Sequence, residues 1–140
     1  MAAEKIVIDA SIIAKCFLEE KYSDKASKLM DAHTSGRFRL VAPSLIVYEV
    51  LNALKRSNIY TKEELTLVSQ SINKYDFELW DLEEGLKEEV IKIAVGYGLS
   101  VYDASYIALA RVLNTTFFTA DEELVRRTKD LKLTKHVREV

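Results

Sequence analysis

The sequence predicts a three-layer α/β domain, in which a parallel β-sheet is flanked by helices. Short β-branched or aromatic runs alternate with longer segments of helical spacing, and parallel strands need such helical crossovers between them. The length of 140 residues, 49% of them hydrophobic, suits one core and hence a single domain over residues 1–140. No repeat, linker or low-complexity stretch divides the chain.

The N-terminal part of the chain predicts two strands separated by two helices. Residues 5–8 are a β-branched run typical of a strand, and residues 11–18 then switch to helical spacing. A second amphipathic helix over residues 23–33 ends before Gly36, where glycine favours a C-terminal cap. Residues 39–42 form the second predicted strand.

A strongly apolar helix follows, which Pro43 and Ser44 open and which extends to about Ser57. Its apolar residues lie on nearly every side, so we expect the helix to be buried. They are Leu45, Ile46, Val47, Tyr48, Val50, Leu51 and Leu54. Glu49 lies among them, and a buried carboxylate needs a partner.

The rest of the chain continues the alternation of helices and strands. Thr-Lys-Glu-Glu at residues 61–64 is a capping-box pattern and begins a helix that extends to Ile72. The later elements are a strand at 77–82, a helix at 83–97 closed by Gly98, a helix at 101–113, a strand at 115–119, a helix opened by Asp121, Glu122 and Glu123, and an edge strand within 133–140.

Composition excludes several classes of protein. Twenty Lys and Arg against 22 Asp and Glu give a net charge of -2, which excludes binding of nucleic acid by a uniform positive field. The only cysteine, Cys16, permits no internal disulfide, and no paired Cys or His spacing indicates zinc. No apolar run approaches the roughly 18 residues of a membrane helix, and no signal-peptide pattern is present. We therefore expect a cytoplasmic protein.

Three aspartates lie where the chemistry of a parallel sheet gathers, at the junctions between strands and helices. Asp9 follows the first strand, Asp121 follows the strand at 115–119, and Asp103 lies near the start of an apolar helix. Each could equally be a helix N-cap, since Asp is favoured there and is stabilised by the helix dipole. These two interpretations remain open for each aspartate.

Glu49 also has two interpretations. Asn52 and Arg56 follow it at i+3 and i+7, so Glu49 could head a narrow solvated stripe on its helix. Alternatively, it points into a cluster of carboxylates whose repulsion is offset by a divalent cation. Ligation by carboxylate oxygens alone selects Mg²⁺ or Mn²⁺, and such ions activate water for phosphoryl transfer without a side-chain nucleophile. We expect His33 merely to complement a helix C-terminus and His136 to be an exposed strand or loop residue.

Four stretches in a fixed order resemble the PIN-domain ribonucleases, and most closely the small single-domain toxins of the VapC type. They are Ile6-Val7-Ile8-Asp9-Ala10-Ser11; Pro43-Ser44-Leu45 with Glu49 and Asn52-Ala53-Leu54; Leu99 through Ala110, with Val101-Tyr102-Asp103-Ala104-Ser105-Tyr106; and Thr119-Ala120-Asp121. Each pattern alone is weak, whereas four in the right order over nearly the whole chain are specific.

The resemblance implies a PIN-like fold and a Mg²⁺- or Mn²⁺-dependent endoribonuclease, the toxin of a toxin–antitoxin pair. The residues implied at the metal are Asp9, Glu49, Asp103 and Asp121, with Ser11 and Thr119 as supporting hydroxyls. A homodimer and an antitoxin protein that blocks the site are implied as well. Attack by a metal-activated water on RNA would leave 5′-phosphate and 3′-hydroxyl ends.

Several residues are candidates for holding RNA, and each has a plainer alternative. Lys15, Lys55, Arg56 and Arg111 could grip the backbone or lie on solvated helix faces. Tyr48, Tyr102 and Tyr106 could stack on bases, although aromatic residues of apolar helices more often belong to the core. The basic tail over residues 126–138 could contact RNA, a partner or only solvent.

Three other functions compete with the nuclease. A response-regulator receiver needs paired acids after the first strand, but Ala10 and Ser11 follow Asp9. A haloacid-dehalogenase phosphatase needs a second Asp at the position of Ser11. The more serious alternative is a non-catalytic module of the same fold that binds RNA or a protein. Such a module has no evident reason to keep four carboxylates that repel one another without metal.

Overall fold

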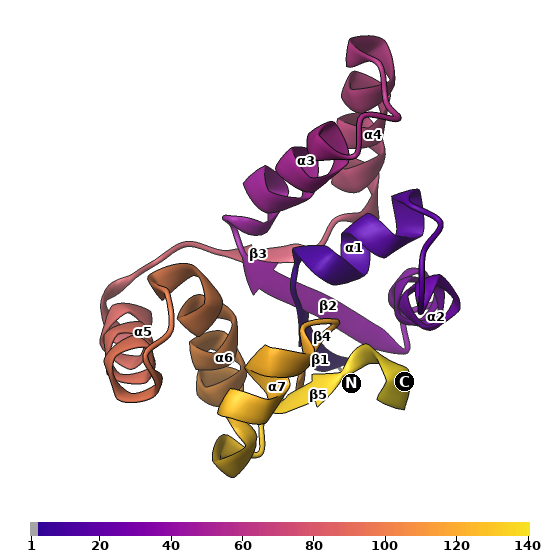
Figure 1. Cartoon of the computed structure of the whole chain (residues 1–140). Helices are drawn as coiled ribbons and strands as arrows, with labels where there is room; N and C mark the ends of the chain where they lie inside the picture. The colour runs from indigo at the N-terminus through magenta and orange to yellow at the C-terminus, as the bar shows by residue number, and fades with distance from the viewer. Residues whose placement is uncertain (1–2) are drawn as a thin grey trace.

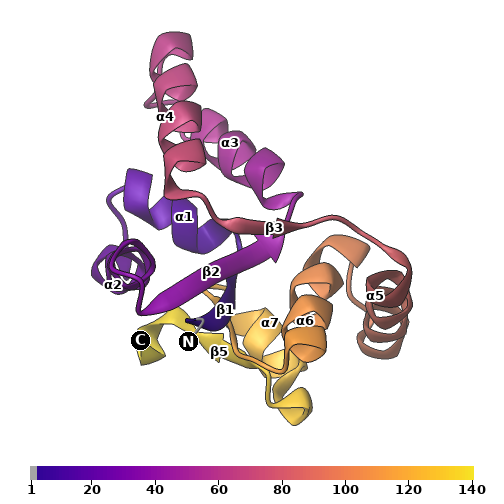
Figure 2. The same cartoon turned by 180° about the vertical axis from the view of Figure 1, so that it is seen from behind.

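The computed structural model describes residues 3–140 and confirms the predicted α/β architecture, with helices on both faces of a five-stranded parallel sheet (Figures 1 and 2). The strands are β1 (Glu4–Ile8), β2 (Phe38–Pro43), β3 (Glu78–Trp80), β4 (Phe117–Thr119) and β5 (Thr134–His136). The helices are α1 (Ala10–Phe17), α2 (Ser23–Thr34), α3 (Ile46–Arg56), α4 (Lys62–Tyr75), α5 (Glu84–Tyr97), α6 (Val101–Leu113) and α7 (Glu122–Arg127), with short 3₁₀ turns at Lys129–Leu131 and Val137–Glu139.

The strands lie in the order β3-β2-β1-β4-β5, and every neighbouring pair is parallel. The chain builds outward from β1 to β3, then returns through α5 and α6 to place β4 on the other side of β1. A receiver domain would have the order 2-1-3-4-5, so the topology excludes that alternative. The order reverses between β1 and β4, and ligands of open α/β sheets bind at such a point.

The core lies between the sheet and the helices that cover it. Val7, Leu40 and Phe117 of the central strands are fully buried, and α6 is buried continuously over residues 104–110. Three alanines in that stretch of α6 allow the helix to lie close against β1 and β2. The ring of Tyr106 stacks on that of Phe117 with centroids 5.5 Å apart, which fixes α6 over the centre of the sheet.

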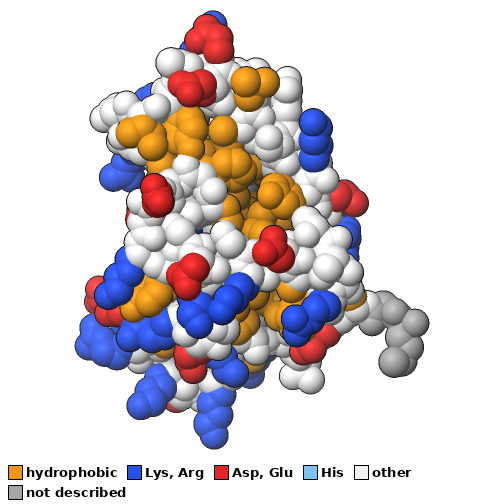
Figure 3. All heavy atoms as spheres, turned by 90° about the vertical axis from the view of Figure 1, so that its right-hand side faces the viewer, with side chains coloured by type: hydrophobic (Ala, Val, Ile, Leu, Met, Phe, Trp, Pro, Cys, Tyr) orange, Lys and Arg blue, Asp and Glu red, His pale blue; other side chains and the backbone are white. Residues whose placement is uncertain are grey.

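The helix predicted from Pro43 is shorter and less buried than expected. Pro43 still belongs to β2, and α3 begins at Ile46. The buried residues of α3 are Ile46, Val50 and Leu54, one stripe that packs toward α1, whereas Tyr48 is 81% exposed. The prediction of complete burial was wrong because α3 and α4 form an arm that projects from the sheet (Figure 1). Figure 3 shows hydrophobic side chains gathered over the upper half of one face, at the level of this arm.

Local signals at the ends of other elements are confirmed. Thr61 and Glu64 form the predicted capping box at the start of α4. Gly98 caps α5 with a φ of +63°, a left-handed conformation that glycine adopts without a steric cost. The predicted edge strand exists as β5 but is only three residues long.

Within residues 3–140, no helix is both long enough and apolar enough to cross a membrane.

Both histidines connect separate elements of the fold. His33 accepts from the Leu40 amide through Nδ1, so Nε2 carries the proton and donates to the Tyr75 carbonyl at 2.6 Å. His136 is only 4% exposed, so the expectation of an exposed residue was wrong. Its Nε2 donates to the Ala120 carbonyl at 3.2 Å, which anchors the segment between β4 and α7. Burial, with the charge of Arg138, lowers the pKa of His136 and favours the neutral ring.

Candidate active site

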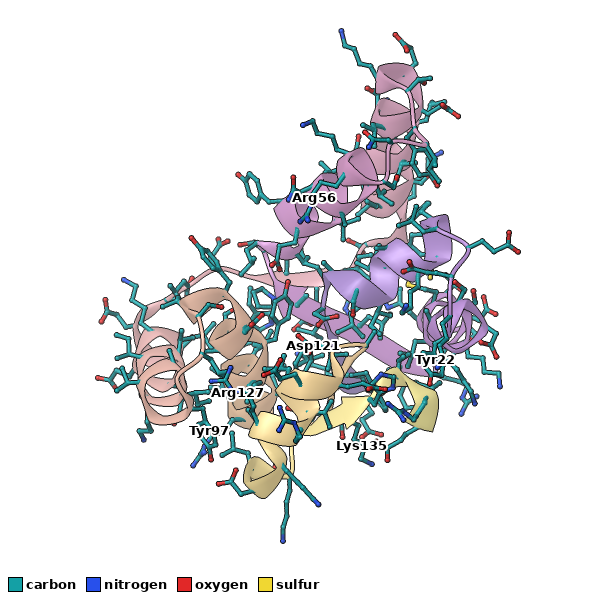
Figure 4. All side chains as sticks on the ribbon, viewed as in Figure 1. Tyr22, Arg56, Tyr97, Asp121, Arg127 and Lys135 are labelled. Atoms are coloured by element: carbon teal, nitrogen blue, oxygen red, sulfur yellow. The ribbon has the colours of Figure 1, made fainter. Side chains whose placement is uncertain are left out.

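The site lies where the strand order reverses, at the carboxyl ends of β1 and β4. Asp9 follows β1 directly and is the N-cap of α1. Asp121 follows β4 and is the N-cap of α7, at the centre of the view in Figure 4. Both aspartates are therefore helix caps, as one interpretation of the sequence held, but this cap role also brings them to the edge of the sheet where ligands bind.

Two hydroxyls hold Asp9 in one orientation. Asp9 Oδ1 accepts from the backbone amide of Ser11 at 3.1 Å and from its hydroxyl at 2.5 Å. Asp9 Oδ2 accepts from the Thr119 hydroxyl at 2.5 Å. Ser11 Oγ and Thr119 Oγ in turn accept from the amides of Ala120 and Asp121, each at 3.1 Å. These bonds fix the segment that carries Asp121 relative to Asp9.

Asp103 is not a helix cap. Ser100 is the N-cap of α6, and its hydroxyl accepts from the backbone amide of Asp103 at 3.0 Å. The cap interpretation therefore fails for Asp103, whose carboxylate remains available to a ligand. Burial, followed by the negative charge of Asp121, raises the pKa of Asp103, and the charge of Arg127 opposes this effect.

Glu49 points toward the other acids. The hydroxyl of Tyr106 donates to Glu49 Oε1 from the neighbouring helix α6. Burial is the largest effect on Glu49 and raises its pKa, and the charge of Asp103 raises it further. Asn52 and Arg56 are exposed further along α3, whereas Glu49 is half-buried and turned inward. The geometry therefore disfavours the solvated-stripe interpretation.

The four carboxylates form a chain of mutually repelling charges. Burial raises the pKa of Asp9 from 3.8 to about 6, and the negative charge of Glu49 raises it further. In the same way, the charge of Asp103 raises the pKa of Glu49, and the charge of Asp121 raises the pKa of Asp103. Within residues 3–140, no three potential metal-ligating side chains are close enough together to hold an ion by themselves. Mg²⁺ retains several waters and binds through one or two carboxylates plus phosphate oxygens, so a chain of carboxylates fits it better than a closed cage would.

Arg127 belongs to the predicted basic tail of residues 126–138, and the structure places its charge beside the site acids. Its guanidinium donates to the carbonyls of Tyr97 and Gly98, both at 2.8 Å, and it lies beside Tyr97 in Figure 4. These bonds fasten α7 to the turn between α5 and α6. Arg127 is also the cation whose charge acts on Asp103. A basic residue in the last turn of a helix is ordinary in sequence, so only the folded chain shows this role.

The predicted RNA-holding cations differ in availability. The Lys15 side chain is only 11% exposed and pairs with Glu20 at 3.3 Å. Arg111 lies 3.7 Å from Glu89. Lys55 and Arg56 are exposed on α3, and neither forms an ion pair within the described residues 3–140. Of the four candidates, these two are therefore the most available to a polyanion.

The three candidate tyrosines also differ. Tyr106 is buried, as expected for a core residue, and it orients Glu49. Tyr48 and Tyr102, however, are 81% and 64% exposed. Both are sequence neighbours of a site carboxylate, Glu49 and Asp103 respectively. Stacking on bases therefore remains possible for these two tyrosines and not for Tyr106.

Substitution of Asp9 by Asn is expected to stabilise the metal-free protein at high pH. Because the folded-state pKa of about 6 exceeds the usual 3.8, the folded state binds more protons than the unfolded state between these values. The free energy of unfolding therefore falls as the pH rises through this window and stays low above it. Asn retains an oxygen for the Ser11 amide, so we expect a gain on the order of 1–3 kcal/mol near pH 8.

Urea denaturation of both proteins in EDTA measures this difference. The gain should disappear near pH 4, where the Asp9 carboxyl is protonated in the folded protein as well. A difference in stability between the two proteins that is the same at pH 8 and at pH 4 would contradict the raised pKa of Asp9.

The fold and the site together define the class of protein. The model of the PIN domain family matches residues 6–130, and the chain belongs to this family. Its curated relatives include Ribonuclease VapC3 of Pyrobaculum aerophilum, which is 31% identical over 131 residues, or 88% of this chain and 94% of the relative. Exonuclease VapC9 of the same organism is 32% identical over 99 residues, or 71% of this chain and 74% of the relative.

Solved structures show the same fold. PAE2754 from Pyrobaculum aerophilum has 28% sequence identity and a TM-score of 0.65, with 99% of this chain and 93% of the other covered. The predicted resemblance to PIN-domain proteins of the VapC type is thus confirmed, and it extends over nearly the whole chain.

Proposed function

We propose that the protein is an endoribonuclease that depends on Mg²⁺ or Mn²⁺ and hydrolyses RNA phosphodiester bonds. The observation that carries this proposal is the chain of charges that couples Asp9 to Glu49, Glu49 to Asp103 and Asp103 to Asp121, with raised pKa values for the first three acids. The names of the two curated relatives support a nuclease. Residues 1–140 would act as one PIN domain in the cytoplasm.

Some side chains of the site orient the carboxylates, and the carboxylate oxygens that remain would bind the metal. Ser11 and Thr119 hold Asp9, and the Tyr106 hydroxyl holds one oxygen of Glu49, so the other Glu49 oxygen is free to bind. Asp121 uses Oδ1 to cap α7 at 3.1 Å, which leaves Oδ2 for a ligand. When bound, the divalent cation would supply the positive charge that activates a water and stabilises the leaving oxygen.

Among residues 3–140, no side chain at the site is placed to act as a nucleophile. The hydroxyls of Thr119 and Tyr106 are buried, the Ser11 hydroxyl is held between Asp9 and the Ala120 amide, and both histidines are engaged elsewhere. Water is therefore the proposed nucleophile, and the 2′-hydroxyl of the RNA is not needed. Hydrolysis with departure of the 3′ oxygen leaves a 5′-phosphate and a 3′-hydroxyl.

The biological setting we propose is a toxin–antitoxin pair, with this chain as the toxin, acting as a homodimer. The similarity to VapC proteins supports it. The arm of α3 and α4 leaves Tyr48, Ile59 and Leu67 more than half exposed. Exposed apolar side chains of this kind are suited to a protein partner. An antitoxin that covers the acids would hold the nuclease inactive.

A circular single-stranded RNA tests the proposed reaction, because it has no end from which an exonuclease can start. We expect the protein to open the circle in Mg²⁺ or Mn²⁺ and to leave 5′-phosphate and 3′-hydroxyl ends. Products with 2′,3′-cyclic phosphates would contradict attack by water. Cleavage of linear but not circular RNA would instead assign the chain to the exonucleases, as the name of its relative VapC9 suggests for that protein.

A further inference from the structure

An apolar cavity of about 200 Å³ lies on the β3 side of the sheet and is lined in part by residues of α6 and by Leu45 at the start of α3, the two helices that carry Asp103 and Glu49. In Figure 2 the chain that leaves β3 passes the start of α6 on its way to α5. The residues that line the cavity come from these segments and from the start of α3. Its lining residues are all uncharged. They are Pro43, Ser44, Leu45, Trp80, Leu82, Leu86, Val101, Tyr102 and Ser105.

The cavity and the carboxylates share two helices. On α6, Tyr106 donates to Glu49, and the charge of Asp121 acts on Asp103. The residues that precede these two on the helix, Ser105 and Tyr102, line the cavity. Leu45, at the N-cap of α3, also lines it and precedes Glu49 by one helical turn. One RNA strand could therefore contact the cavity with a base and the carboxylates with its backbone.

We propose that this cavity binds one nucleobase of the RNA strand whose backbone lies at the carboxylates, with Tyr102 and Trp80 as the aromatic contacts. The proposal rests on the proposed nuclease function and adds a base-binding site to it. Single-stranded RNA is recognised by unstacked bases that lie against aromatic side chains. Tyr102 is 64% exposed although it borders an apolar hollow, as expected of a side chain that a ligand covers.

The uncharged lining of this cavity favours a nucleobase over the phosphate backbone of the RNA. No Lys, Arg or His of the described part of the chain lines it, and Ser44 donates its hydroxyl to Asp81 at 2.8 Å. A phosphate in the cavity would therefore meet a carboxylate and no cation. A neutral aromatic base enters the cavity without the free-energy cost of burying an unpaired charge. The Ser105 hydroxyl donates to the Tyr102 carbonyl at 2.6 Å, which leaves oxygen lone pairs on both serines for the amino or imino groups of a base.

Trp80 is the only tryptophan in the chain, so the tryptophan fluorescence reports on the surroundings of this one lining residue. The binding assay uses the Asp103→Asn background in Mg²⁺, so that the strand stays intact. The probe is a short single-stranded oligoribonucleotide, and the control is an oligomer of the same length whose riboses carry no bases. We expect the first to quench Trp80 fluorescence saturably and the second to leave it unchanged.

Substitutions on α6 separate stacking from general helix effects. Tyr102→Ala should weaken binding roughly 5- to 100-fold, while Tyr102→Phe, which keeps the ring, should bind like the parent. Val112→Ala is the matched control, an exposed apolar residue in the last turn of the same helix. In the nuclease with Asp103 intact, Tyr102→Ala should raise KM for RNA by a similar factor and leave kcat nearly unchanged.

The outcomes distinguish this proposal from the nuclease itself. Saturable quenching without cleavage of any RNA by the wild type would support the base site and contradict the nuclease. Cleavage with unchanged Trp80 fluorescence, or with the same KM in Tyr102→Ala, would overturn the base site alone. Equal quenching by the base-free oligomer would also overturn it. A shift of Trp80 emission with protein concentration in the absence of RNA would assign the cavity to a second copy of the chain instead.

Discussion

Substitution of Asp103 by Asn is expected to lower RNA cleavage by at least about a hundredfold while leaving the fold intact. The amide has the same shape as the carboxyl but lacks the charge that a divalent cation requires. The substitution is structurally mild because Ser100 caps α6 through the backbone amide of residue 103, which Asn retains. Removal of a negative charge beside Asp121 also relieves repulsion, so stability should be unchanged or slightly higher.

Asp76→Asn is the matched control for this substitution. Asp76 is exposed beyond the end of α4, and its left-handed φ of 54° suits Asn. Cleavage rates and thermal melting of the two variants are measured side by side on protein prepared identically. Activity of Asp103→Asn equal to that of Asp76→Asn would contradict a role for Asp103 in the reaction and point to a contaminating nuclease.

The second large effect is expected from Thr119→Val, which replaces a hydroxyl by a methyl group of similar size. Thr119 Oγ donates to Asp9 and accepts from the Asp121 amide, so its loss removes the bond that connects the two acids. Residues that orient metal ligands typically contribute 10- to 100-fold to activity, and we expect a loss of about that size. Thr119 is fully buried, so the groups left without a partner should cost about 1–3 kcal/mol of stability.

Thr119→Ser separates orientation from packing, because it keeps the hydroxyl and removes only the methyl group. We expect its kcat to lie close to that of the wild type, even where its stability is lower. If Thr119→Ser loses as much activity as Thr119→Val, the methyl group rather than the hydroxyl is what matters, and the proposed support of Asp9 is refuted. Steady-state cleavage rates at saturating metal decide between the two.

The position of Asp9 and Asp121 at one edge of the sheet could be predicted from the sequence, but the surroundings of each acid could not. The carboxyl ends of parallel strands meet at one edge, which brings Asp9 and Asp121 together. Whether Asp103 caps its helix depends on where α6 begins, and helix ends are set by local hydrogen bonds such as that of Ser100. The inward turn of Glu49 depends on Tyr106, a residue on a different helix.

The largest misjudgements concern burial, which tertiary packing decides. The apolar residues of α3 predicted a buried helix, yet only the face toward α1 is covered, so Tyr48 remains exposed. His136 lies in a short edge segment that looked exposed, but its ring is buried and donates to the Ala120 carbonyl. The Arg127 contacts and the cavity beside Trp80 join segments far apart in sequence, for which a single sequence gives no signal.

The dependence of cleavage on a divalent cation is the most direct measure of the central claim. The circular RNA is incubated with protein that has been stripped with EDTA, and Mg²⁺ or Mn²⁺ is then added back in excess. The proposed site predicts no cleavage in EDTA and full recovery on addition of either cation, because the carboxylates supply no nucleophile of their own. Undiminished cleavage in EDTA would contradict the account.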